Sequence, residues 1–231
     1  MFFGADPTYL LCVFLPALIL SLGVQFYVRN TFARWSRVPN RAQVTGKQTT
    51  DMLFQRTTLN PVRVEPTRGS LTDHFDPRDN IVRLSETVYG KTTVSALAVS
   101  AHELGHVQQY QTGSSLIKAR GILLPAIQYS PTLSYMSILM GIIFNISGLV
   151  WLGVLFFALL VVFSFLTLPI ELDASRRAIR MLEASGLLVS TEDKAGAQAV
   201  LRAAAMTYLA AAITSLLQLF YYMSLASRRS S

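Results

Sequence analysis

The chain has 231 residues, of which 52% are hydrophobic and 14% are charged, and its mean hydropathy is +0.41. This balance is unusual for a soluble domain and predicts an integral membrane protein, with the lipid bilayer as a partner. The net charge is +7, but the sequence has no zinc-finger pattern, basic-aromatic RNA motif or phosphate loop, so no nucleic-acid partner is expected. The single cysteine, Cys12, excludes an internal disulfide framework.

Long stretches without a charged residue predict the membrane-spanning helices. No Asp, Glu, Lys or Arg occurs over residues 7–28, 121–170 or 203–227. A helix needs about 20 apolar residues to cross a bilayer, so the longest stretch is long enough for two crossings joined by a turn near residues 145–148. We therefore predict four spans, at about 8–28, 121–144, 149–169 and 204–225.

The first apolar segment is expected to be a span rather than a cleaved signal peptide. Its flank, Met1 to Pro7, carries no basic residue, and its apolar stretch is longer than the apolar region of a signal peptide. Five basic residues follow this segment before the next acidic residue, Asp51. They are Arg29, Arg34, Arg37, Arg41 and Lys47.

The positive-inside rule predicts that this basic flank stays in the cytoplasm and that the N-terminus faces out. With four spans, residues 29–120 and 171–202 then lie together on the cytoplasmic side of the plasma membrane. The sequence thus predicts a single, mainly α membrane domain over 1–231, with a small α+β catalytic part facing the cytoplasm.

The region before residue 94 has the pattern of a small mixed α and β structure. Val44 to Thr57 predicts a helix, although Gly46 weakens that prediction. Residues 61–66 alternate like a strand, and residues 71–85 have the pattern of a hairpin around a turn-rich tetrad at 76–79. In zinc peptidases a strand beside the metal helix often pairs with an extended substrate, and Ile81–Ser85 is our candidate for that free edge.

The pentapeptide 102–106 is the strongest chemical signal in the chain. His102 and His106 are four residues apart, so on a helix they share a face and can bind one divalent metal. Glu103 lies about 100° around the helix, where it can take a proton from a water at the metal. This is the pattern of a zinc-dependent peptidase.

The residues around the motif favour one continuous helix. Outside the motif itself, residues 94–110 contain neither Gly nor Pro, Thr92 or Thr93 can cap the N-terminus, and Gly113 can end the helix. The alternative interpretation is an ordinary amphipathic helix with two hydrogen-bonded histidines.

A catalytic zinc usually has three protein ligands, so a third must lie elsewhere. Position 112, where metzincins continue with a histidine, is Thr112, and His74 lies upstream in a predicted strand region. A better candidate is an acid at the start of a second helix. Glu171 and Asp173 cannot both face the metal from a helix, and we favour Glu171. Ser175 shares its face and can hydrogen-bond a group behind the ligands.

The chain resembles the YugP-like neutral zinc metallopeptidases of bacterial membranes. The similar passages follow in order over most of the chain, at 64–66, 71–77, 82–85, 101–106, 168–178 and 203–208. Residues 171–175 also resemble, more loosely, the ligand helix of HtpX-like and CAAX-prenyl membrane proteases, where an E-x-x-x-D pattern supplies a glutamate ligand and an aspartate behind it. That resemblance implies that Glu171 is the ligand. Ser175 stands where the aspartate would be, and Asp173 is a candidate substitute.

The sequence therefore predicts a membrane zinc endopeptidase that acts on membrane-associated or cytoplasm-facing proteins or peptides. In this interpretation His102, His106 and Glu171 bind Zn²⁺, and Glu103 is the general base. The candidates for stabilising the oxyanion are His74, Arg176, Arg177 and Tyr208.

Two other functions are alternatives to a peptidase. A catalytically silent zinc-binding membrane scaffold is the main alternative, and the intact Glu103 argues against it because a structural site needs no base. An ion transporter is disfavoured because the predicted spans contain no ionisable carboxylate, histidine or basic residue.

Overall fold

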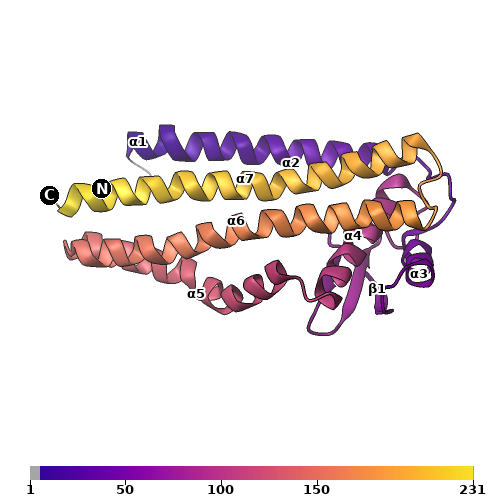
Figure 1. Ribbon diagram of the computed structural model, residues 1–231. Coiled ribbons are helices and arrows are strands. Elements are labelled where there is room, and N and C mark those ends of the chain that lie inside the picture. Colours follow the sequence, from indigo (N-terminus) through magenta and orange to yellow (C-terminus); the bar gives the residue numbers. More distant parts are fainter. Residues whose placement is uncertain (1–5, 231) are drawn as a thin grey trace. The chain divides into compact units, whose positions relative to one another are not determined.

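The computed structural model describes residues 6–230, which are mainly helical (Figure 1). The helical segments are α1 (Pro7–Tyr9), the π-helical η2 (Leu10–Phe14), α2 (Leu15–Trp35), α3 (Gly46–Arg56), α4 (Val94–Gln111), α5 (Ser115–Ile143), α6 (Ser147–Ala184) and α7 (Thr191–Ser230). Three strands form the only sheet in this part of the chain: β1 (Arg63–Thr67), β2 (His74–Asp76) and β3 (Ile81–Ser85). The predicted outward-facing N-terminal end includes residues 1–5, which lie outside the described residues.

The described chain divides into two compact units. We call residues 6–24, 118–169 and 207–230 the hairpin unit, and residues 25–117 and 170–206 the site unit. The helices α2, α5, α6 and α7 each contribute residues to both units.

Three helical stretches between residues 6 and 230 are long and apolar enough to cross a membrane: Pro7–Trp35, Ser147–Ala184 and Thr191–Arg229. They contain the predicted spans 8–28, 149–169 and 204–225. The predicted span 121–144 does form a helix, α5, but α5 does not meet the same criterion, so three of the four predicted spans coincide with candidate membrane helices. Two prolines, Pro125 and Pro131, and several serines interrupt the apolar residues of this predicted span.

α5 and α6 form a close-packed helical hairpin inside the hairpin unit. The turn falls at residues 144–146, as predicted, and Asn145 takes the left-handed conformation there with φ of +55°. A Cβ at Gly153 of α6 would lie 2.8 Å from the carbonyl oxygen of Ser134, and the Ser134 Oγ donates to the Gly153 carbonyl at 2.8 Å. Small residues at such a contact are typical of helix packing in membranes.

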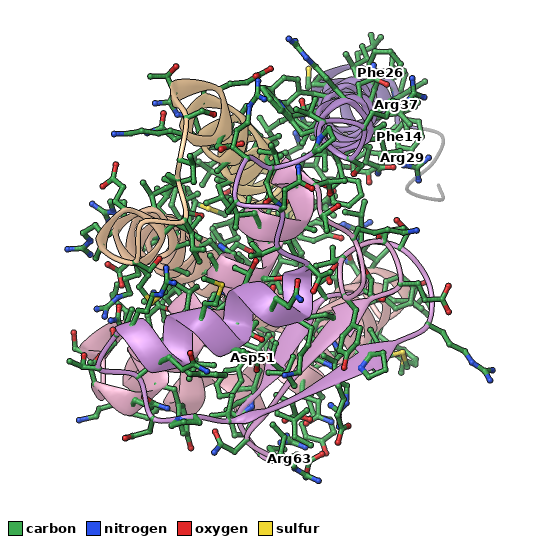
Figure 2. The ribbon with its side chains drawn as sticks, turned by 90° about the vertical axis from the view of Figure 1, so that its right-hand side faces the viewer. Phe14, Phe26, Arg29, Arg37, Asp51 and Arg63 are labelled. Atoms are coloured by element: carbon green, nitrogen blue, oxygen red, sulfur yellow. The ribbon has the colours of Figure 1, made fainter. Side chains whose placement is uncertain are left out.

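α2 changes from apolar to basic along its length. Phe26 is 70% exposed, while Arg29 and Arg37 project from the end of the helix and the segment after it (Figure 2). The Arg34 guanidinium lies 5.3 Å from the centre of the Trp35 ring, a cation–π contact. An exposed aromatic surface followed by arginines is typical of a helix that ends at a membrane surface.

The sheet has the order β1-β3-β2, with β1 parallel and β2 antiparallel to β3. The predicted hairpin is confirmed, since Phe75 pairs with Val82 across β2 and β3. The prediction that Ile81–Ser85 offers a free edge is wrong, because β1 covers its other side. An alternating sequence pattern identifies a strand but does not say how many neighbours pair with it. The edges of this sheet are β1 and β2.

α3 begins at Gly46, and the helix predicted over 44–57 is confirmed. Thr45 and Gln48 form a capping box in which each side chain bonds the other's backbone N–H. Gly46 is the first helical residue rather than an interior one. A Cβ there would lie 2.4 Å from the Val88 carbonyl oxygen, so this glycine permits a close approach instead of weakening the helix.

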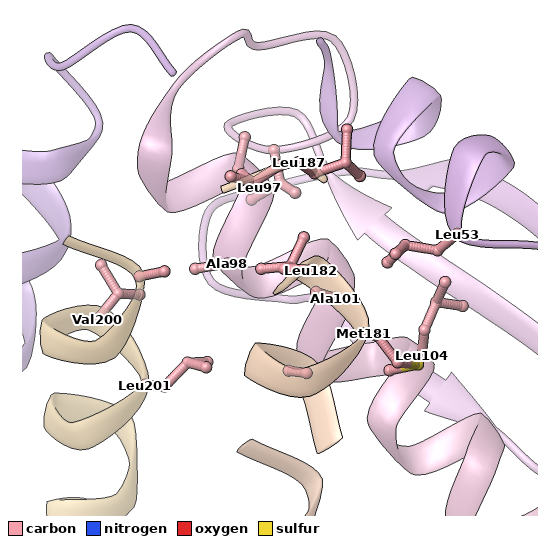
Figure 3. Close-up of a cluster of buried hydrophobic side chains, with 14 of the residues drawn as sticks. Leu53, Leu97, Ala98, Ala101, Leu104, Met181, Leu182, Leu187, Val200 and Leu201 are labelled. Carbon is pink, nitrogen blue, oxygen red and sulfur yellow. The ribbon is translucent and has the colours of Figure 1, made fainter. Parts of the chain in front are cut away.

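The core of the site unit is built around α4. Leu97, Ala101 and Leu104 of α4 are fully buried and belong to one apolar cluster with residues of α3, α6 and α7 (Figure 3). The other labelled members include Leu53, Met181, Leu182, Val200 and Leu201. The helix that carries the histidines is therefore held on several sides by packing, as a rigid metal site requires.

Candidate metal centre

α4 positions both histidines of the motif on one uninterrupted helix. Thr93 caps its N-terminus by accepting from the Ala96 N–H at 3.3 Å, which decides between the two predicted caps. Gly113 follows the C-terminus with φ of +62°, as predicted. His102 and His106 are half-buried, and their ring centres lie 4.8 Å apart.

Glu171 of α6 lies against both imidazoles. Its Oε2 is 3.3 Å from the His102 Nε2 and 3.4 Å from the His106 Nε2. One donor atom from each of the three residues lies within 4.8 Å of the other two, and this is the metal-binding cluster found among residues 6–230. His106 and Glu171 therefore lie side by side, although residues 107–170 separate them in the sequence.

Two of the three distances between ligand atoms in the cluster suit a tetrahedral zinc ion. Bonds of about 2.05 Å from zinc to nitrogen or oxygen place neighbouring ligand atoms about 3.3 Å apart. The two distances from Glu171 Oε2 to the imidazole nitrogens, 3.3 and 3.4 Å, are of this size. Two imidazoles and one carboxylate are also the donor set of a catalytic zinc that keeps its fourth position open.

The Nδ1 atom of each histidine forms a hydrogen bond with a neighbouring side chain, and the Nε2 atom of each ring faces Glu171. His102 Nδ1 lies 3.3 Å from Ser175 Oγ, so Ser175 contacts a histidine of the cluster directly rather than a group behind it, and His106 Nδ1 lies 3.0 Å from Gln109 Oε1. Partners of this kind determine which ring nitrogen can bind a metal.

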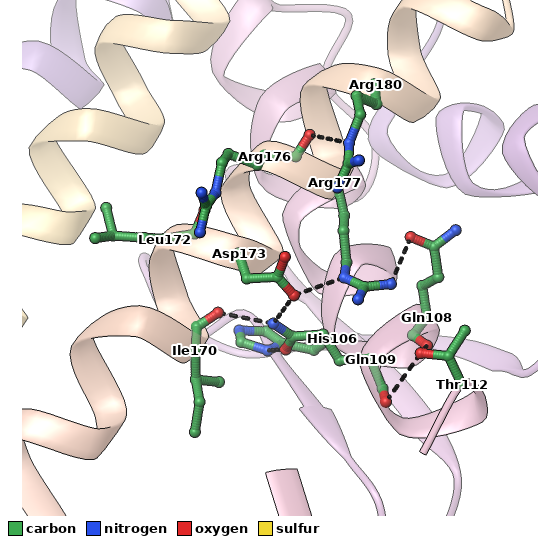
Figure 4. Close-up of polar contacts among 10 residues, drawn as sticks. All are labelled: His106, Gln108, Gln109, Thr112, Ile170, Leu172, Asp173, Arg176, Arg177 and Arg180. Carbon is green, nitrogen blue, oxygen red and sulfur yellow. Dashed lines mark hydrogen bonds and ion pairs between the residues drawn. The ribbon is translucent and has the colours of Figure 1, made fainter. Parts of the chain in front are cut away.

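Asp173 takes part in a separate network beside the cluster (Figure 4). Its Oδ2 accepts from Gln109 Nε2 at 2.9 Å and from Arg177 Nε at 2.6 Å, and Arg177 also donates to Gln108 at 3.2 Å. Gln109 donates in addition to the Ile170 carbonyl at 2.8 Å. The structure thus places Glu171 at the histidines and Asp173 behind His106, one hydrogen-bonded residue away.

Gly105, inside the motif, sets the spacing between α4 and α6. A Cβ at this position would lie 2.4 Å from the Ala174 carbonyl oxygen, which is closer than such contacts occur. The missing side chain therefore lets the two helices approach where the cluster forms. Both Gly105 and Gln109 were overlooked in the sequence, since a glycine inside a helix and a glutamine three residues after a histidine carry no distinctive signal alone.

Glu103 is 6% exposed and lies on the buried side of α4. Burial raises the pKa of its carboxyl group, and the nearby His102 and His106 offset only part of this effect. No hydrogen bond to its carboxylate occurs among the described residues. A buried carboxylate with unused acceptor capacity beside the cluster is suited to hold and deprotonate a water molecule.

The predicted oxyanion groups lie in different surroundings. Arg177 forms an ion pair with Asp173. The Arg176 Nε donates a hydrogen bond to the Leu172 carbonyl, one turn earlier on α6. His74 is exposed on β2, where its Nδ1 lies 2.8 Å from the Thr72 carbonyl. Tyr208 belongs to the hairpin unit. The metal-binding cluster contains none of the four.

Comparisons with known proteins agree with this geometry. The sequence profile of the family described as "Putative neutral zinc metallopeptidase" matches residues 10–227. The chain is 37% identical over 206 residues to the "Putative membrane protease YugP" of Bacillus subtilis (strain 168), with 89% of this chain and 91% of that protein covered. No solved structure matched the chain. The chain is therefore a zinc metallopeptidase and belongs to the neutral zinc metallopeptidase family, with its His-His-Glu cluster at the expected spacing.

Proposed function

We propose that this protein is a zinc-dependent membrane endopeptidase that hydrolyses peptide bonds in membrane-associated or cytoplasm-facing proteins. The observation that carries the proposal is the convergence of His102, His106 and Glu171 within 4.8 Å, with Glu103 on the same helix as both histidines. The family match supports the peptidase class.

The residues of the cluster have distinct roles in this proposal. His102 Nε2, His106 Nε2 and a Glu171 oxygen hold the ion, and bound zinc supplies Lewis acidity toward water and the scissile carbonyl. The Glu103 carboxylate accepts a proton from the attacking water and later donates it to the leaving amine. Ser175 and Gln109 keep both imidazoles oriented.

The catalytic face is proposed to lie in the cytoplasm. The basic residues after the first apolar helix favour that side for the site unit. Because His106 and Glu171 meet in the structure, the intervening chain crosses the membrane an even number of times. α6 supplies one crossing, so α5, its close-packed neighbour in the hairpin unit, is proposed as the other.

β2 is the proposed docking strand for an extended substrate. It is an edge of the sheet and packs against α4, and the Phe75 ring contacts the Tyr110 ring edge-on with centres 5.9 Å apart. An edge strand beside a metal helix can add a substrate strand through main-chain hydrogen bonds.

The test separates metal binding from proton transfer. Glu103→Gln keeps the size of the side chain and removes its basicity, so the variant should retain about one zinc per chain and lose roughly 10²–10⁴-fold in hydrolysis of casein or a model peptide. His106→Ala and Glu171→Ala should lose most of the zinc, measured by atomic absorption on purified protein.

Three results would contradict the proposal. Full zinc content in both ligand variants would show that the metal is held elsewhere. Equal turnover by the wild type and Glu103→Gln would remove the role of this base. Cleavage of cellular proteins is detected as protein fragments that occur in wild-type cells and are absent from Glu103→Gln cells. A wild type that holds zinc but produces no such fragments would favour the scaffold alternative.

A further inference from the structure

A groove of about 610 Å³ lies between α6 and α7 inside the site unit. Leu172, Ile179 and Leu201 form part of an apolar lining, and three arginines from the two helices border it: Arg176, Arg180 and Arg202. His102, His106 and Glu171 do not line the groove, but Asp173 and Ser175 do.

The positive charges of the three arginines are not neutralised by ion pairs with carboxylates. Arg176 Nε donates to the Leu172 carbonyl at 3.3 Å and Arg180 Nε to the Arg176 carbonyl at 3.4 Å, and all three residues are exposed. Within residues 6–230, no ion pair joins any of them to a carboxylate. Asp173, the acidic residue in the lining, already accepts hydrogen bonds from Gln109 and Arg177. The groove therefore presents unpaired guanidinium groups above an apolar lining.

The position of the arginines along the chain places the groove at the membrane surface. Arg176 comes six residues after the end of the uncharged stretch 121–170, which corresponds to about 9 Å along a helix. Arg202 directly precedes the uncharged stretch 203–227. The headgroup layer adds about 5–8 Å to each side of the hydrocarbon core, so long arginine side chains on both helices reach it.

We propose that this groove binds the phosphate-bearing headgroup of an anionic phospholipid, with acyl chain carbons against Leu172 and Leu201. Guanidinium groups suit this ligand because they donate two parallel hydrogen bonds to phosphate oxygens. Basic pockets between membrane helices on the cytoplasmic side are a known form of lipid recognition. Arginines that only set the orientation of the protein in the membrane need to lie near its surface. They do not need to line one cavity from two different helices, as these three do.

The test measures the binding of short-chain lipids to the detergent-solubilised full-length protein by calorimetry. Dihexanoyl phosphatidylglycerol should bind about tenfold more tightly than dihexanoyl phosphatidylcholine. The triple variant Arg176→Gln, Arg180→Gln, Arg202→Gln should lose this preference. A control triple variant, Arg29→Gln, Arg37→Gln, Arg41→Gln, changes the net charge equally on exposed residues outside the groove and should keep it.

The single variant Arg202→Gln provides a milder change that tests the same site, and it should lower the preference severalfold. Equal loss of the preference in both triple variants would overturn the proposal in favour of general surface charge. Displacement of the lipid by inorganic phosphate at matching concentration would overturn the lipid assignment in favour of a free phosphate. Displacement by hexaglutamate would instead indicate a site for acidic peptide.

Discussion

His106 has one ring nitrogen committed to a neighbour and the other directed at Glu171. The Gln109 amide group donates to the Ile170 carbonyl and to Asp173, so its oxygen must be the atom that faces His106 Nδ1. Since that oxygen can only accept, Nδ1 carries the hydrogen and Nε2 keeps the lone pair that a metal needs. Gln109 also joins α4 to α6 directly behind the cluster.

Replacing Gln109 tests this positioning role. Gln109→Met keeps the length of the side chain but removes the acceptor for His106, so we expect a 10–100-fold loss in zinc affinity, on the order usual for such partners. Zinc affinity is measured by competition with a chelator, and unfolding of the metal-free protein is followed in parallel. Gln108→Met is the matched control, because Gln108 contacts Arg177 but not His106. Unchanged zinc affinity in Gln109→Met would refute the role.

Two elements, α4 and α6, carry the whole cluster, and their separation depends on Gly105. Two physical effects predict opposite outcomes for Gly105→Ala. Alanine is the better helix former by about 1 kcal/mol, which would raise stability. A Cβ 2.4 Å from the Ala174 carbonyl must push the helices apart, and overpacking of this kind costs about 1–3 kcal/mol. The larger cost decides the outcome.

We therefore expect Gly105→Ala to lower both thermal stability and zinc content, although every ligand remains in place. The measurements are the unfolding temperature and the metal content of the purified variant. Gly90→Ala is the control, because a Cβ at Gly90 meets no heavy atom within 4 Å. A Gly105→Ala protein that is more stable than wild type and binds zinc normally would show that α4 and α6 can accommodate a Cβ at this position, and would contradict the role of Gly105.

At the scale of the whole molecule, the site and the membrane topology constrain each other. A helix that crosses once displaces its end by the thickness of the hydrocarbon, about 30 Å. The histidines precede α5 and α6 in the chain, and Glu171 follows the apolar part of α6. The cluster can form in a membrane only if α5 and α6 return the chain to the side from which it entered.

Cysteine labelling in intact cells tests this topology. In a Cys12→Ser background, Ser115→Cys and Val189→Cys flank the two crossings at exposed positions, and both should resist a membrane-impermeant thiol reagent. Ile146→Cys lies at the turn between α5 and α6, where the native side chain is 49% exposed, and should react. Labelling of Val189→Cys with Ser115→Cys protected would refute the double crossing.

Local sequence patterns were sufficient for much of this protein. Uncharged stretches located the apolar helices because a charge in hydrocarbon is costly, and the turn near Asn145 is the most polar point of the longest stretch. The spacing of His102 and His106 determined the ligand helix, since the helical repeat puts them on one face whatever surrounds them. Glu171 was also predicted to join the two histidines, and it does lie in their cluster. Its choice over Asp173 depended on an expected class of site and on a family resemblance.

Only the tertiary structure decided which groups lie behind and between these elements. Gln109 orients His106 because Ile170 and Asp173 approach from another helix, and Gly105 matters because Ala174 lies against it. β3 proved to be central because a distant strand, β1, pairs with its second side. Each of these facts depends on a contact between residues far apart in the chain. A periodic pattern reports which face of a helix or strand is buried, but it does not report what buries it.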